Sequence, residues 1–390
     1  MSLNLDKSTW KRVTFGDVVK NLNVAVKDPV AEGIDRIIAM EHLDPGELKI
    51  NRWGDLEDGT TFTRRVRPSQ TLFGKRRAYQ RKAAYAEFDA VCSGDILVFE
   101  ADPQKMLPEF LPFLVQSDGF YGHALGTSAG SLSPRTNWRD LANFEFDLPP
   151  LDEQLRIANL LWSIVRHQLA VAEMAAGLMQ VRAVWRSALF AEPSVTARLE
   201  ERAEITLGRQ RAPQHATGDH MRDYVRSANV AGGHVSLNDI KQMNFTPTEQ
   251  RKFRLRPGDV LVSEGTASAR ELGSSAMWEP VDPDAEMYFQ KTLLRLRAVD
   301  GLSTPTLLRE WAQWAQESGA FVKVATGTGI LHITGVRCAA MPFPVLTYAE
   351  QQALGERAAQ LSDAALSIQC EMDEGMRLRG ALIDEVFGAN

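Results

Sequence analysis

The sequence has little of several residue types on which catalytic and metal sites depend. Its 390 residues include only three cysteines and seven histidines. Cys92, Cys338 and Cys370 lie too far apart for a disulfide framework or a structural zinc site. The histidines have no metal-ligand spacing, and neither a P-loop nor a dinucleotide-binding glycine motif is present. These absences predict a non-catalytic chain that binds no metal and no cofactor of its own.

Long apolar runs are missing as well. No stretch approaches about 18 consecutive apolar residues, so we expect no membrane span. The first residues, 1–13, lack the apolar core of a signal peptide, which predicts a cytoplasmic protein. The formal net charge of −6 argues against a general nucleic-acid binder, unless positive charge is concentrated locally.

An internal repeat organises the chain. Residues 65–72 match 254–261 at an offset of 189, and earlier segments match at 187. From about residue 93 the offset stays at 197, as Pro108 with Pro305 and Phe146 with Phe343 illustrate. The order of these identities predicts two copies of one structural unit.

Each copy begins with a region rich in glycine, proline and short apolar runs. Such runs at 95–99, 258–262 and 292–296 predict strands bounded by turns. Helical segments are expected near 107–119 and 304–318. We therefore predict an α+β fold with a mixed or antiparallel sheet in each copy.

A heptad pattern follows in each copy. Positions alternately four and three residues apart are apolar at eight of ten places in 153–190, and again at the equivalent places of the second copy. This predicts domains at 1–150 and 193–347 and long helices at 151–192 and 348–390. Thr347 and Glu350 have the spacing of a capping box, whereas Asp152 is the expected cap of the first helix.

The order of these elements predicts two similar mixed α/β domains separated by a long antiparallel two-helix coiled coil. A helix of 38 residues would be about 57 Å long. Such a pseudo-two-fold arrangement suits duplex DNA, whose backbone has approximate two-fold symmetry. A plain structural hairpin or a dimerisation device is the alternative explanation of the heptads.

A basic segment at 64–82 contains eight basic and no acidic residues. Arginine and lysine neutralise DNA phosphates, although a solvated charge run is the alternative. Arg65 and Arg67 recur as Arg254 and Arg256, which favours function. The candidate DNA-binding residues here are Arg64, Arg65, Arg67, Lys75, Arg76, Arg77, Tyr79, Arg81, Lys82, Arg254 and Arg256.

Three loops rich in glycine and hydroxyl residues, at 126–131, 263–270 and 326–332, are further candidates. Short hydroxyl side chains and backbone N–H groups suit contacts to phosphates or base edges, but ordinary turns have the same composition. The candidates named from these loops are Thr266, Ser268, Arg270, Thr326, Thr328 and His332.

Several motifs together resemble those of one known family. They are Trp10 with Gly16-Asp17-Val18, the segment 71–82, and Phe146-Asp-Leu-Pro-Pro-Leu-Asp-Glu-Gln154 before a long helix. The second copy carries a weaker form, Phe343 to Gln351, without the paired prolines. Over nearly its whole length the chain resembles the specificity (S) subunit of type I restriction-modification systems.

The resemblance implies a non-enzymatic subunit whose two target-recognition domains each read one half of a split, asymmetric DNA sequence. It also implies two methyltransferase (M) subunits, which bind S-adenosylmethionine, and possibly motor-nuclease restriction (R) subunits, which use ATP and magnesium. The helices would act as spacer and docking surface. Residues expected there are Pro149, Pro150, Glu153, Gln154, Ile157, Leu161, Ile164, Val171, Leu178, Arg182, Trp185, Glu350, Gln351, Leu354, Leu361, Ile368, Met372, Arg379 and Leu382.

Three other hypotheses remain open on the sequence. The chain could serve a related type II-like or phage-defence methylation system, or it could be a coiled-coil scaffold that binds only proteins. A self-sufficient nuclease is the third, and the absence of an acidic metal cluster argues against it.

Overall fold

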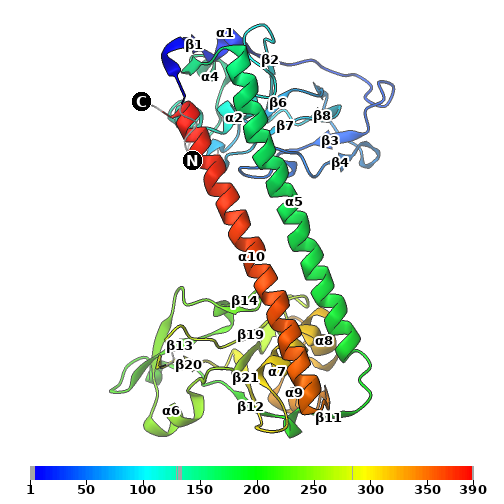
Figure 1. Ribbon diagram of the computed structural model, residues 1–390, viewed down its shortest axis with the longest axis vertical. Helices are drawn as coiled ribbons and strands as arrows, with labels where there is room; N and C mark the ends of the chain where they lie inside the picture. Colours follow the sequence, from blue (N-terminus) through cyan, green and yellow to red (C-terminus); the bar gives the residue numbers. More distant parts are fainter. Residues whose placement is uncertain (1–4, 129, 131–133, 283, 389–390) are drawn as a thin grey trace. The chain divides into compact units, whose positions relative to one another are not determined.

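The computed structural model describes residues 5–128, 130, 134–282 and 284–388, and they form two compact units. The first unit contains Met1–Glu173 and Gln369–Asn390, and the second contains Met174–Ile368. Two long helices, α5 (Leu151–Phe190) and α10 (Tyr348–Phe387), each contribute one half to each unit. Figure 1 shows α5 in green and α10 in orange to red.

The first unit is built on two four-stranded sheets. One is antiparallel, in the order β2-β9-β6-β7, and the other, β4-β3-β8-β5, contains a parallel β3–β8 pair. Strands β1 and β10 form a separate pair. The elements are β1 (Lys11–Thr14), α1 (Phe15–Val18), β2 (Val19–Leu22), β3 (Arg36–Ile38), β4 (Gly54–Asp55), β5 (Arg64–Val66), β6 (Thr71–Gly74), β7 (Ala83–Tyr85), β8 (Ala90–Cys92), β9 (Ile96–Ala101), α2 (Leu111–Gln116), α3 (Asp118–Gly126), α4 (Trp138–Leu141) and β10 (Glu145–Leu148).

The second unit repeats this plan. Its antiparallel sheet has the order β12-β21-β17-β19, and a sheet β16-β13-β20 contains the parallel pair β13–β20. The elements are β11 (Thr196–Arg198), β12 (Ala203–Leu207), β13 (Met221–Val225), β14 (Val230–Ala231), β15 (His234–Val235), β16 (Lys241–Asn244), α6 (Pro247–Phe253), β17 (Val260–Ser263), β18 (Gly265–Thr266), β19 (Ser275–Met277), β20 (Tyr288–Phe289), β21 (Leu293–Ala298), α7 (Pro305–Glu317), α8 (Ala320–Val324), β22 (Leu331–His332), α9 (Gly335–Ala339) and β23 (Pro342–Pro344).

Strand registers recur between the units at the offsets found in the sequence. Ile37 faces Val91 in the first unit, and Tyr224 faces Tyr288 in the second, at offsets of 187 and 197. The antiparallel sheets match too, since Thr71 pairs with Phe99 as Val260 pairs with Leu296. The predicted internal repeat and mixed α+β fold class are therefore confirmed.

The helical segments expected before the long helices differ between the units. The segment 304–318 forms one helix, α7, as predicted. Residues 107–119 instead form α2 and the start of α3, separated by Ser117. Ser117 has an extended backbone, and its hydroxyl accepts a hydrogen bond from the N–H of Phe120, which caps α3.

The long helices pack into the core of each unit. In the first unit, Ile157 and Leu161 of α5 share a buried cluster with Leu382 and Val386 of α10. Because the beginning of one helix meets the end of the other, the helices run antiparallel within this unit. The second unit likewise combines the end of α5 with the beginning of α10. In the part of the chain that the structure describes, no helix is both long and apolar enough to cross a membrane.

The two long helices begin differently. For α10, Thr347 and Glu350 form the predicted capping box, in which the Glu350 carboxylate accepts from the Thr347 N–H at 2.7 Å. The Thr347 hydroxyl also donates to this carboxylate and lowers the pKa of Glu350. Helix α5 begins at Leu151, so Asp152 lies inside its first turn, and the prediction that Asp152 caps this helix is wrong.

Candidate nucleic-acid interface

In the first unit, the loop after β6 lies against the segment 134–136. The Lys75 N–H donates to the carbonyl of Asp95 at 3.0 Å, and the Thr136 N–H donates to the carbonyl of Lys75 at 2.8 Å. Arg76 and Arg135 form an antiparallel bridge. The fold thus holds two surface loops, 75–77 and 134–136, side by side.

The second unit builds the same frame after β17. The Glu264 N–H donates to the carbonyl of Thr292 at 2.9 Å, and the Ile333 N–H donates to the carbonyl of Glu264 at 2.7 Å. Strands β18 and β22 then pair Gly265 with His332. A side chain at Gly265 would meet the His332 ring, because a Cβ there would lie 2.5 Å from Nδ1. We call each pair of adjoining segments, 75–77 with 134–136 and 264–268 with 326–333, the paired loops.

The paired loops of the first unit present an excess of positive charge. Arg76 and Arg135 approach the opposite oxygens of Asp95 at 3.8 and 3.4 Å, and both guanidinium groups stay about half exposed. Arg77 is exposed, with no hydrogen bond or ion pair to its side chain within the described residues. Burial, with help from the charge of Arg64, lowers the pKa of Lys75. Tyr79 is exposed beside this loop.

Half of the basic residues in the predicted segment bond to other residues of the first unit. The guanidinium of Arg65 donates to Glu32 and Asp89, and the hydrogen bond that it donates to Asp89 raises the pKa of Arg65. The other internal contacts join Arg64 to Asn23 and the Ile96 carbonyl, Arg81 to Asp118 and the Gln116 carbonyl, and Lys82 to the Met40 carbonyl. Arg64, Arg65, Arg81 and Lys82 thus have partners within the unit, whereas Arg67, Arg76 and Arg77 are exposed; the DNA-binding role of the whole set stays a prediction.

The recurrence of arginines between the copies has a structural explanation. Arg65 pairs with Val91 across two strands, and Arg254 forms the equivalent bridge to Tyr288. Arg254 also contacts the carboxylate of Glu286 at 3.0 Å. Arg256 is exposed, and its N–H donates to Asp259 as the Arg67 N–H donates to Gln70. Strand pairing and turn formation explain why these arginines lie at equivalent positions. Neither contact depends on the side chain, so the function predicted from the recurrence stays a prediction.

The two hydroxyl-rich loops of the second unit, both predicted to bind DNA, lie next to each other in the structure. Thr326 and His332 exchange backbone hydrogen bonds of 2.8 and 2.9 Å. The Thr266 hydroxyl accepts from the Ser268 N–H, and His332 lies 3.5 Å from the carboxylate of Glu264. Thr328 and Arg270 are exposed. In the loop 126–131, Ala129 and Ser131 lie outside the described residues, as do Met1–Asn4.

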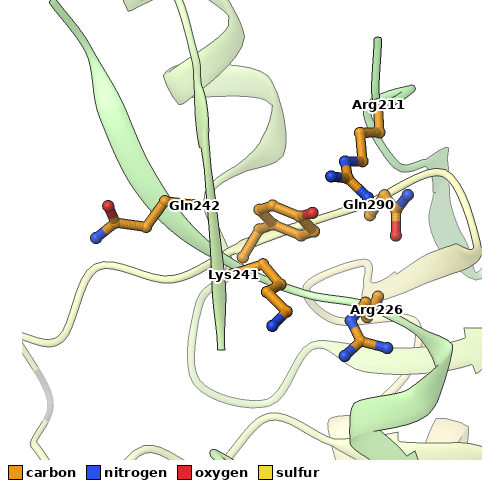
Figure 2. A pocket seen from close by; sticks show the side chains of 6 residues that line it. Arg211, Arg226, Lys241, Gln242 and Gln290 are labelled. Atoms are coloured by element: carbon orange, nitrogen blue, oxygen red, sulfur yellow. The ribbon is translucent and has the colours of Figure 1, made fainter. Parts of the chain in front are cut away.

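A polar pocket that the sequence did not predict opens on the second unit, with a volume of about 420 Å³. Its lining residues are Arg211, Tyr224, Arg226, Lys241, Gln242 and Gln290, and Figure 2 shows five of them labelled. Gln242 is at its edge, and its side chain points away from the other four labelled residues. The lining residues come from four separate segments, so no local motif signals the pocket.

Most of the predicted docking residues face inward. Gln154 is fully buried and binds three backbone groups, the N–H of Leu107 and the carbonyls of Lys105 and Pro149. Gln351 makes the equivalent bonds to the carbonyls of Leu302 and Leu346. Both glutamines fasten the start of a helix to its own unit, and neither offers its side chain to a partner.

The other predicted helix residues divide by exposure. Ile157, Leu161, Ile164, Val171, Leu354, Leu361, Leu382 and Pro149 are buried. Glu153, Leu178, Arg182, Trp185, Ile368, Met372 and Arg379 are half-buried, and Pro150 and Glu350 are exposed. Several exposed apolar side chains on the helices were not predicted, namely Leu151, Leu155, Met174, Met179, Val181, Val184, Leu366 and Met376. They lie outside the heptad positions, and the sequence prediction considered only those positions.

Solved structures match this arrangement along almost the whole chain. One, from work on complex assembly and conformational transition of the type I restriction-modification system, matches with a TM-score of 0.63 and 20% identity over 97% of both chains. The type I restriction-modification S subunit from M. genitalium matches with a TM-score of 0.59 and 13% identity over 100% of both chains. The chain has the fold of type I specificity subunits.

The sequence comparison points to the same group of proteins over a shorter span. The specificity subunit of the type I restriction enzyme EcoDI from Escherichia coli is 26% identical over 152 residues, which are 38% of this chain. The match spans about a third of that relative's length. No protein-family model matches the sequence. The resemblance to type I specificity subunits predicted from the motifs is confirmed.

Proposed function

We propose that the chain is the DNA-specificity subunit of a type I restriction-modification complex. Each unit would read one half of a bipartite, asymmetric site, and the chain itself would carry out no reaction. S-adenosylmethionine, ATP and magnesium would be bound by partner subunits. The fold shared with type I specificity subunits over the whole chain is the observation that carries this proposal.

The paired loops support DNA reading by the first unit. They hold Arg76, Arg77 and Arg135 on one surface, with Asp95 as the neighbouring acid. Exposed arginines bind phosphate oxygens in a fixed register, which positions the fewer residues that read bases. The same main-chain frame in the second unit presents hydroxyl groups and His332, so the two units would make different contacts from equivalent loops.

The long helices would dock the partner subunits. Exposed apolar side chains on a helix suit a protein partner, because contact removes them from water. On α5, Met174, Met179, Val181 and Val184 are all at least half exposed. These residues replace the buried heptad positions as the proposed contacts of M subunits.

The test uses the chain together with a methyltransferase (M) subunit from the same host. Methylome sequencing of a host expressing both would first define the site. Binding to that duplex would then be measured at several salt concentrations. Arg76→Ala with Arg77→Ala should weaken binding and lower the salt slope by about one unit per lost phosphate contact.

A matched variant removes the same charge elsewhere on the first unit. Lys11 and Arg139 are exposed and lie outside the paired loops, so Lys11→Ala with Arg139→Ala should leave the salt slope unchanged. An unaltered slope in the Arg76 and Arg77 variant would exclude these loops from the interface. A complex that yields no bipartite methylation motif would contradict the proposed function itself and favour a protein-only scaffold.

A further inference from the structure

The pocket of the second unit owes its shape to a close approach of two backbone segments. Arg209 lies beside Gln290 in a parallel bridge, and its N–H donates to the Phe289 carbonyl at 3.1 Å. Gly208 permits this approach, because a Cβ there would lie 2.2 Å from the Gln290 carbonyl oxygen. Arg211, two residues further on, lines the same pocket as Gln290 (Figure 2).

A buried ion pair holds this segment in place. Arg209 is 5% exposed, and its guanidinium donates to Glu249 at 2.8 Å and lies over the ring of Phe245. Thr246 caps α6 and also binds Glu249, which ties the pair to a helix. The pocket wall that carries Arg211 is thus anchored from within the unit.

Positive charge in the pocket exceeds what its neighbours neutralise. Arg226 and Lys241 share one carboxylate, that of Asp239. Arg211 has no hydrogen bond or ion pair within the described residues, and it is exposed at the pocket mouth. The pocket therefore holds a guanidinium ready to bind an anion, beside two further cations that share a single counter-charge.

The first unit has no such pocket chemistry at the equivalent positions. The shared strand registers place Ile37 where Tyr224 lies, Gly54 where Lys241 lies and Ser93 where Gln290 lies. Arg226 corresponds to Ala39 by the same offset. None of these four residues carries a charge, so the cationic pocket is a property of the second unit.

We infer that this pocket binds a backbone phosphate of the second half-site, with Gln290 beside it as a reader of a base edge. The inference rests on the proposed function and deepens it. Arg211, Arg226 and Lys241 supply the donors for the phosphate. Gln290 lines the same pocket as Arg211, and a glutamine amide pairs with adenine in the major groove. The two units would then hold the duplex with different parts of one fold.

The phosphate part of the inference is tested by Arg211→Ala with Lys241→Ala, assayed as the complex with M subunit. Affinity for the full site should fall about tenfold or more at physiological salt, and the salt slope should fall by about two units. Binding to a duplex that keeps only the first half of the site should stay as in the unaltered complex. The control, Arg251→Ala with Lys252→Ala, removes two exposed cations of α6 that do not line the pocket.

The reading part is tested by Gln290→Ala against Gln242→Ala. Both glutamines line the pocket, but the amide of Gln242 donates to Asp223 at 2.7 Å, and its side chain points away from the other labelled residues. Methylome sequencing should show a relaxed base preference at one position of the second half for Gln290→Ala, and an unchanged motif for Gln242→Ala.

Two results separate this inference from the proposed function. A bipartite motif that persists unchanged in the Arg211 and Lys241 variant, with an unaltered salt slope, would overturn the pocket and leave the proposed function standing. Failure of the unaltered complex to bind or methylate a bipartite site would remove both.

Discussion

In each unit the end of a long helix packs at an equivalent position, but the contact is apolar in the first unit and ionic in the second. In the first unit, Ile383 of α10 and Phe113 of α2 belong to one apolar cluster. At an offset of 197, the second unit has Arg186 of α5 and Glu310 of α7, which form an ion pair of 2.8 Å. Arg186 also bonds Glu317 and Gln313, and Glu310 has no exposed surface. The same backbone frame therefore tolerates either an apolar contact or a buried ionic network.

Surface charge differs between the units in a comparable way. The first unit has Arg76, Arg77 and Arg135 on its paired loops, and the second unit has Arg211, Arg226 and Lys241 around its pocket. Backbone hydrogen bonds recur at both places, while the side chains do not. The difference shows that strand register and the glutamine contacts at the helix starts define the fold, which leaves the surfaces free to recognise unlike sequences.

The largest effect is expected from breaking the ionic contact of the second unit. Glu310→Ala leaves Arg186 buried without its main carboxylate, and a buried charge that loses its partner costs about 3–5 kcal/mol of unfolding free energy. Arg186→Ile should cost a similar amount, because Glu310 then stays buried with only Arg182 and Arg309 nearby. Chemical denaturation of the chain, followed by circular dichroism, measures both.

A second variant replaces the ion pair by the apolar residues found at the equivalent positions of the first unit. Arg186→Ile combined with Glu310→Phe removes both buried charges, and an apolar pair of this kind is often neutral or stabilising. The double variant should therefore be more stable than either single one. Glu317 would lose its partner, but it is partly exposed to water, and burial, partly countered by Arg186, now raises its pKa. If the loss of unfolding free energy in the double variant equals the sum of the losses in the two single variants, Arg186 and Glu310 are not energetically coupled.

The next effect concerns the glutamine at the start of each long helix. Gln154 satisfies three buried backbone groups, whereas Gln351 satisfies two and its own Oε1 has no partner within the described residues. Gln154→Ala should cost about 2–3 kcal/mol and Gln351→Ala about 1–2 kcal/mol, since each unsatisfied buried group adds to the loss. Hydrogen exchange at the Leu107 amide should accelerate only in the Gln154 variant. Equal losses in the two variants would mean that the third hydrogen bond contributes nothing.

Features carried by local patterns could be predicted from the sequence. The capping residues Thr347 and Glu350 and the heptads placed the starts of the long helices at Leu151 and Tyr348. The repeat offsets placed β6 over β17 and β9 over β21. These features depend on spacing along the chain or on identity between copies, and both are visible without coordinates.

The roles of individual charges could not be predicted, because they depend on distant partners. Arg65 is neutralised by Glu32 and Asp89, which lie 33 and 24 residues away in the chain. The sequence of a basic segment therefore does not show that half of its basic residues bond to other residues of the same unit. The pocket combines Arg211, Lys241 and Gln290 from three segments, and its only local sign is the glycine before Arg209. Close backbone approach of this kind follows from tertiary packing alone.

The smallest effect is expected at the ion pair behind the pocket, which the first unit lacks. Burial raises the pKa of Glu249, but hydrogen bonds from Arg209 and Thr246 outweigh it and lower the pKa to about 2. A carboxyl whose pKa is depressed on folding stabilises the folded state above its unfolded pKa, and this contribution disappears as the pH falls towards the folded value. Glu249→Gln should cost about 1 kcal/mol near pH 7, at the low end for a charged hydrogen bond because Glu249 is partly exposed.

The pH dependence makes this prediction specific. The difference in melting temperature between the unaltered chain and Glu249→Gln should be largest near neutral pH and should shrink as the pH falls below the ordinary range of a glutamate, about 4.3. Glu279→Gln, at an exposed glutamate of the same unit, serves as the control and should show a small difference at every pH. If this difference in melting temperature stays constant down to acid pH, the charge of Glu249 does not stabilise the segment that carries Arg211. The backbone contacts of Gly208 and Arg209 alone would then hold the pocket wall.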